Sequence, residues 1–309
     1  MTPSNATAID GRGKKRESSR AFQMYGWAGL AVILLMELTL LLKEMAVPGT
    51  WTSYSASRLA QWTTPVCWWG YILTIDALIY KLRGTSLLYN RRREFWLQLP
   101  LSIAFWLIFE VYNLHLDNWT YVGLAAQWWE AVLTTLIAFA TIMPALFLTA
   151  ELLATLKIFE GLRAPAFHPS NRLLYVLLLL GLGCLMAPLL VPREIARYLF
   201  ALVWIGFIPL CEPVLYASDG DSLLRDLTQG RLHRLLSLMS AGYVCGVLWE
   251  FWNYWATAKW IYTAPFTPDV HVFEMPLAGF LGFGPFAWEF AAMYAMVRLA
   301  GRDLKSNAT

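Results

Sequence analysis

Residues 173–191 read LLYVLLLLGLGCLMAPLLV, a run of 19 residues without a single charged side chain. A transmembrane helix needs roughly 20 consecutive, mostly apolar residues. Basic residues stand just outside the run, at Arg172 and Arg193. The run is therefore predicted to cross a membrane as one helix.

The rest of the chain follows the same pattern. Its 309 residues are 58% apolar and only 15% charged, whereas soluble proteins carry roughly 25% charged residues. The net charge of +3 is small and gives no reason to expect nucleic acid as a partner. We predict an all-α integral membrane protein of about eight transmembrane helices. The predicted spans lie at about 25–43, 64–81, 95–113, 128–156, 173–191, 198–217, 232–254 and 271–298.

The basic residues predict the orientation of these spans. With the N-terminus inside, all but five of the 24 Lys and Arg residues fall in cytoplasmic segments, and such an excess marks the cytoplasmic side. We expect a multi-pass protein of the cytoplasmic (inner or plasma) membrane with both termini in the cytoplasm. Residues 1–20 are predicted to be a flexible basic tail and residues 301–309 a second cytoplasmic tail. The outer side keeps only Lys43, Arg58, Arg193, Arg197 and Lys259.

An internal repeat divides the chain into two halves. Residues 109–121 (FEVYNLHLDNWTY) resemble residues 249–262 (WEFWNYWATAKWIY), and residues 84–88 (GTSLL) resemble residues 220–224 (GDSLL). We predict two four-helix repeats, over residues 21–160 and 161–300. Because each copy has an even number of helices, both copies enter the membrane from the same side, which makes the repeats parallel.

Acidic residues near the outer ends of the spans are the first candidates for a functional site. A charge inside a bilayer costs roughly 2.5 kcal/mol or more on insertion scales, so each such residue is a functional candidate. In each copy a Glu and an Asn share one helix face, a Trp-x-Tyr loop follows, and a Glu is expected in the first turn of the next helix. Two carboxylates in a poorly hydrated pocket repel, so one is expected to hold a proton and act as a general acid. The predicted catalytic residues are Glu110, Asn113, Tyr121 and Glu130 in the first copy, and Glu250, Asn253, Tyr262 and Glu274 in the second.

The same groups also fit a purely structural role, as hydrogen bonds that tie the helices to the loop. A second intramembrane acidic set lies deeper or toward the cytoplasm. In this set Asp76 could face Glu151, and Glu212 could face Glu289.

The residues that could bind a metal are sparse. His115 and His271 lie near the outer acids, but the sequence contains no HxxH or ExxH motif. The four cysteines stand singly in apolar stretches and indicate neither a disulfide framework nor a zinc site. We therefore predict no metal and no cofactor.

The outer motif resembles the membrane-embedded lycopene cyclase domain family, whose domain is also duplicated. The resemblance consists of an aromatic residue followed by an acid, then Trp-x-Tyr, then an acid at the start of the next helix. Glu110, Trp119, Tyr121 and Glu130 match it in the first copy, and Glu250, Trp260, Tyr262 and Glu274 match it in the second. The family's Pro-x-acid-acid pair is absent, because Glu130 follows two tryptophans and Pro276 comes after Glu274. The resemblance implies protonation of a polyene end, followed by cyclisation or hydration, with no obligatory redox cofactor.

Our leading interpretation is an intramembrane enzyme that performs acid-base chemistry on an isoprenoid or carotenoid-like lipid bound between the repeats. Membrane lipids are the other expected partners. Two further hypotheses stay open: a transporter or channel with an acidic repeat interface, and a non-catalytic subunit that binds partners in a larger membrane complex.

Overall fold

The chain is helical almost throughout. The computed structural model describes residues 21–265 and 270–306, and the predicted tail at residues 1–20 lies outside them. The first half contains α1 (Met24–Met45), α2 (Trp51–Leu59), η1 (Ala60–Trp62), α3 (Thr63–Arg83), α4 (Leu87–Asn90), α5 (Arg92–Leu116), β1 (Trp119–Val122), α6 (Trp128–Phe139) and α7 (Ile142–Thr155). The second half contains α8 (Asn171–Leu190), α9 (Arg193–Ala196), α10 (Phe200–Ala217), α11 (Leu223–Thr228), α12 (His233–Trp255), β2 (Lys259–Tyr262), β3 (His271–Val272), β4 (Met275–Pro276), η2 (Leu277–Gly282) and α13 (Phe283–Ser306).

Within the described residues, seven helical segments are long and apolar enough to cross a membrane. They confirm the prediction of an all-α, polytopic membrane protein. The predicted span at 64–81 is the one outside this group. Its helix, α3, is 21 residues long, but Asp76 and several threonines make it less apolar than the others.

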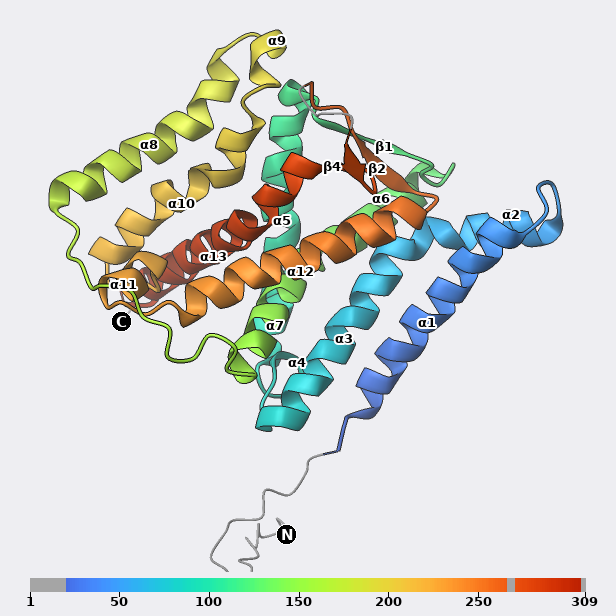
Figure 1. The fold of residues 1–309 in the computed structure, drawn as a ribbon, viewed down its shortest axis with the longest axis horizontal. Helices are drawn as coiled ribbons and strands as arrows, with labels where there is room; N and C mark the ends of the chain where they lie inside the picture. Colours follow the sequence, from blue (N-terminus) through green and yellow to red (C-terminus); the bar gives the residue numbers. More distant parts are fainter. Residues whose placement is uncertain (1–20, 266–269, 307–309) are drawn as a thin grey trace, which may run out of the picture.

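The long helices run between two ends of the molecule (Figure 1). The ribbon of β1 and β2, together with α2 and α9, lies at one end, and α4, α11 and the C-terminal end of α13 lie at the other. Helices α1 and α8 are peripheral and turn apolar side chains such as Leu34 and Leu179 outward. Such faces suit contact with lipid chains, because an apolar bilayer carries no penalty for exposed leucine.

The predicted fourth span bends in its middle. Helix α6 ends at Phe139 and α7 begins at Ile142, and Thr141 Oγ1 donates to the carbonyl of Ala138 at the break. Pro144 lies in the first turn of α7. A proline has no N–H to donate to the carbonyl four positions earlier, so the helix lacks a backbone hydrogen bond at this point.

The expected helical start of the last span is wrong. Residues 271–276 form the short hairpin β3–β4, in which His271 pairs with Pro276 and Val272 with Met275. Phe273 in its turn has a positive φ of 58°, a conformation outside the α-helix. The regular helix α13 starts only at Phe283 and continues to Ser306, so most of the predicted tail at 301–309 is helical.

Equivalent elements of the two halves make equivalent contacts. Helix α1 packs on α3 as α8 packs on α10, and α3 packs on α7 as α10 packs on α13. Asp76 accepts hydrogen bonds from Ser86 Oγ and the N–H of Leu88. Glu212 accepts the same two bonds, at the same sequence separations, from Ser222 Oγ and the N–H of Leu224. Each acid therefore holds the loop that follows its helix.

Candidate functional site

The Trp-x-Tyr segments of the two halves pair with each other. Strands β1 and β2 are antiparallel, with Trp119 opposite Tyr262 and Tyr121 opposite Trp260. Residues two apart on a strand share a face, and directly opposed residues share it too. All four rings therefore lie on one face of the ribbon, while Thr120 on the other face is exposed.

An asparagine fixes the start of each strand. Asn253 Nδ2 donates to the carbonyl of Trp260 (2.8 Å), and the N–H of Trp260 donates back to Asn253 Oδ1 (2.9 Å). Asn113 makes the corresponding bonds with the carbonyl and N–H of Trp119 (2.8 and 3.2 Å). These bonds engage both ends of each amide, so the two predicted asparagines position the strands.

The first carboxylate of the site, Glu110, is held by three donors. Its Oε1 accepts from the indole N–H groups of Trp106 (2.8 Å) and Trp119 (3.2 Å) and from the hydroxyl of Tyr121 (2.5 Å). All three donors therefore converge on one oxygen of the Glu110 carboxylate.

The second carboxylate, Glu250, is held differently. Its side chain is fully buried, and Tyr262 donates to Oε1 at 2.7 Å. The indole of Trp260 donates to the Tyr262 hydroxyl instead of to the carboxylate. Among the described residues, Glu250 Oε2 has no hydrogen-bond partner.

A single difference between the copies contributes to this contrast. In the predicted repeat Gly246 matches Trp106, the donor to Glu110, since both stand four residues before the glutamate. A Cβ atom at position 246 would lie 2.2 Å from the ring of Phe283. The second copy thus replaces an indole donor with the apolar face of a phenyl ring.

The other two outer acids have cationic partners. Glu130 accepts from Arg58 of α2 (2.5 Å) and from the indole of Trp62 (3.0 Å), and Glu274 pairs with Lys259 at 2.5 Å. This differs from the expected carboxylate pairs with Glu110 and Glu250. Glu130 does lie in the first turn of α6 as expected, whereas Glu274 lies in the β3–β4 turn.

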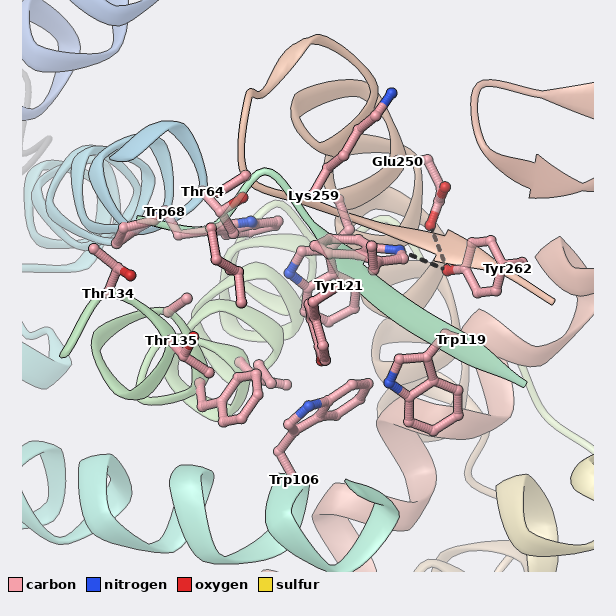
Figure 2. A pocket seen from close by; sticks show the side chains of 18 of the residues that line it. Thr64, Trp68, Trp106, Trp119, Tyr121, Thr134, Thr135, Glu250, Lys259 and Tyr262 are labelled. Carbon is pink, nitrogen blue, oxygen red and sulfur yellow. Dashed lines mark hydrogen bonds between the residues drawn. The ribbon is translucent and has the colours of Figure 1, made fainter. Parts of the chain in front are cut away.

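An aromatic cavity lies beside Glu250, between the two halves. Its open volume is about 120 Å³, and Figure 2 shows the tryptophans and tyrosines that surround it. The Glu250 carboxylate points to the hydroxyl of Tyr262, and the amine of Lys259 points away from the rings. The cavity is lined by Trp68, Trp106, Trp119, Tyr121, Trp204, Trp249, Glu250, Trp260, Tyr262 and Phe286, among others. Of the residues that line this cavity, Glu250 is the one with an acidic side chain.

The phenol groups on the ribbon resist ionisation. Burial, followed by the adjacent carboxylate of Glu110, raises the pKa of Tyr121 well above its usual range. Burial and the carboxylate of Glu250 raise the pKa of Tyr262 in the same way. Both tyrosines are therefore hydrogen-bond donors at neutral pH.

The inner acids have separate partners instead of facing one another. Asp76 and Glu212 hold their loops, and Tyr25 adds a third donor to Asp76. Glu151 pairs with Arg83 and Arg91. Glu289 is fully buried and accepts from the N–H of Phe207.

The two histidines near the outer acids take no part in the cavity lining. His115 Nε2 lies 3.1 Å from the carbonyl of Val191, and His271 is exposed on β3. Over residues 21–265 and 270–306, three or more His, Cys, Asp or Glu side chains nowhere gather closely enough to hold a metal ion.

The sequence did not predict the basic residues that pair with the outer glutamates, or the indole that donates to Glu110. Arg58 and Lys259 neutralise the outer glutamates, and Trp106 completes the bonding of Glu110. Trp106 could have been found, because it lies four residues before Glu110 on one helix face. Arg58 is 72 residues from Glu130, and no local pattern connects them.

No protein-family model, curated protein or solved structure matches this chain.

Proposed function

We propose that the chain is an intramembrane acid-base enzyme that acts on an isoprenoid or carotenoid-like lipid, with Glu250 as the proton donor. One observation carries the proposal: Glu250 is fully buried, lines an aromatic cavity and leaves Oε2 without a partner. A carboxyl group buried without a cation favours its neutral form. A neutral carboxyl group in an apolar cavity can act as a general acid.

The chemical step needs this group, the substrate and, for hydration, one water molecule. Glu250 transfers its proton from Oε2 to one carbon of a C=C bond, and the neighbouring carbon becomes a cation. In cyclisation a second C=C bond attacks this cation and closes a ring, and the Glu250 carboxylate then removes a proton from an adjacent carbon. In hydration a water molecule adds to the cation and gives up a proton to the Glu250 carboxylate, which restores the acid. Tryptophan rings around the cavity favour a cation, because their faces are electron-rich.

The proposed membrane arrangement has eight spans, with α3 added to the seven apolar segments. The chain would lie in the inner or plasma membrane, with both termini in the cytoplasm. Two parallel four-helix repeats, over 21–160 and 161–300, would then meet at β1 and β2. The symmetric pairing of Trp119 with Tyr262 and of Tyr121 with Trp260 supports this duplication. The matched bonds of Asp76 and Glu212 support it independently.

Deuterium incorporation tests the function directly. The purified full-length protein would be reconstituted in liposomes in D₂O with a panel of acyclic prenyl lipids and acyclic carotenoids. We expect a cyclised or hydrated product that carries deuterium at carbon, measured by mass spectrometry. Glu250→Gln keeps the size and hydrogen bonding of the side chain but supplies no acidic proton, so we expect at least a hundredfold loss of product.

Glu94→Gln is the matched control, because Glu94 lies in the first turn of α5, outside the cavity lining, and product should stay within twofold of wild type. The absence of product from wild-type protein with every lipid in the panel would refute the isoprenoid assignment. Unchanged product from Glu250→Gln would refute the role of Glu250. The transporter and the complex-subunit hypotheses would then lead.

A further inference from the structure

A second cavity lies on the other side of the wall that bounds the first. It has an open volume of about 330 Å³, which falls in the roughly 300–1,000 Å³ range of small-ligand sites. Both cavities share the residues of the wall, which are Trp119, Trp204, Tyr262 and Phe283.

The second cavity is the repeat counterpart of the first. Pro65 and Trp68 line the first, and their counterparts Ala201 and Trp204, each 136 positions later, line the second. A different offset, the 144 positions that separate Glu130 from Glu274 in the sequence, relates Thr134, Thr135 and Ala138 of the first cavity to Ala278, Gly279 and Gly282 of the second.

The polar groups of the two cavities differ. Where the first cavity has Lys259, the second has Asn118, which is 141 positions earlier. Asn118 is 3% exposed, and its Oδ1 has no partner among the described residues. Its Nδ2 donates to the carbonyl of Arg197 at 2.9 Å. That bond fixes the orientation of the amide, because exchanging Nδ2 and Oδ1 would place two oxygens in contact.

We propose that the second cavity binds an apolar lipid that carries one hydroxyl group, such as a prenyl alcohol, and that this hydroxyl donates to Asn118 Oδ1. An unpaired buried acceptor selects for a ligand with a donor, since leaving it unpaired is costly. A water molecule alone fits poorly, because a stable buried water needs two to four polar partners and the rest of this lining is mostly apolar. The inference stands whether or not Glu250 transfers a proton.

Binding of radiolabelled farnesol, a C15 prenyl alcohol, to the delipidated full-length protein in detergent micelles tests the site. Farnesyl methyl ether has nearly the same apolar body without the donor. We expect the ether to bind at least tenfold more weakly than the alcohol. Gly282→Leu fills the cavity, since a Cβ there meets no atom within 4 Å, and farnesol binding should fall at least tenfold.

Two matched variants separate this site from the alternatives. Gly183→Leu also extends into open space, but on the exposed face of α8, and farnesol binding should stay within twofold of wild type. Ala138→Leu narrows the first cavity and should leave the preference for farnesol over its methyl ether intact, because Asn118 does not line that cavity. Equal binding of the alcohol and the ether would overturn the role of Asn118. Unchanged farnesol binding in Gly282→Leu, or loss of the preference for the alcohol in Ala138→Leu alone, would overturn the placement of the ligand.

Discussion

Replacing Asn253 by alanine should uncouple β2 from α12. The amide makes two hydrogen bonds to the backbone of Trp260, at 2.8 and 2.9 Å, and its side chain is fully buried. Each buried polar group left without a partner costs about 1–3 kcal/mol, which gives about 2–6 kcal/mol for the pair. Trp260 is only half-buried, so water can reach part of its backbone. We therefore expect the lower end, about 2–3 kcal/mol of the free energy of unfolding.

The assay is reversible unfolding in mixed micelles, with SDS as the denaturant and circular dichroism as the signal. Asn171→Ala is the control, because Asn171 is exposed at the start of α8 and surface substitutions usually stay within about 0.5 kcal/mol. Product formation should also fall in Asn253→Ala, since Tyr262 lies two residues beyond Trp260 and holds Glu250. Equal stability of the two variants would show that the amide does not hold the strand.

Three further predictions follow from the packing, the topology and the tyrosines. Gly29→Leu should destabilise the protein by about 1–3 kcal/mol, the usual cost of overpacking, because a Cβ at position 29 would lie 2.5 Å from the carbonyl oxygen of Gly70; Gly183→Leu, in open space, should not change the unfolding midpoint. Single cysteines at the exposed positions Asn90 and Lys157 should react with an impermeant maleimide only from the cytoplasm, and those at Thr50 and Glu194 only from outside. The four native cysteines are buried, so their background labelling should be low. The opposite labelling at any of the four positions would refute the eight-span arrangement. In an alkaline absorbance titration Tyr121 and Tyr262 should ionise only as the protein unfolds, because their pKa values are raised in the folded state; stability should accordingly be full below about pH 10, the pKa of an unfolded tyrosine, and fall above it, and normal titration of both residues would refute their burial.

The sequence predicted the helices well, because their signal is local. Runs such as 173–191 are apolar over the full width of a bilayer, and α8 covers Asn171–Leu190. The predicted start of the last span was wrong, and the reason again lies in the local sequence. Apolar composition across 271–282 says nothing about backbone conformation, and Pro276 with two following glycines favours a hairpin and a 3-10 turn over an α-helix.

The candidate site was only half predictable. Helix periodicity and a short loop bring Tyr262 to Glu250, as the spacing suggested, whereas Asn253 bonds the backbone of Trp260. The pairing of β1 with β2 joins residues about 140 positions apart. Strands of four residues are too short for an alternation of apolar and polar residues to predict them. The ion pair between Arg58 and Glu130 likewise depends on where α2 lies across the helix ends. Such contacts arise from the tertiary fold, so no window of sequence contains them.

If the proposed duplication and the proposed role of Glu250 hold, one half of the chain supports the reactive group of the other. An unpaired carboxyl group inside a membrane protein is costly, so it persists only where the surrounding structure is fixed by other bonds. The first copy supplies such bonds: three donors hold Glu110, and Asn113 holds β1. Since β1 pairs with β2 along its whole length, the order of the first copy extends to the strand that carries Tyr262. Under that proposal, glycine at position 246 supplies no donor to Glu250, while the paired strands still hold Tyr262 against it.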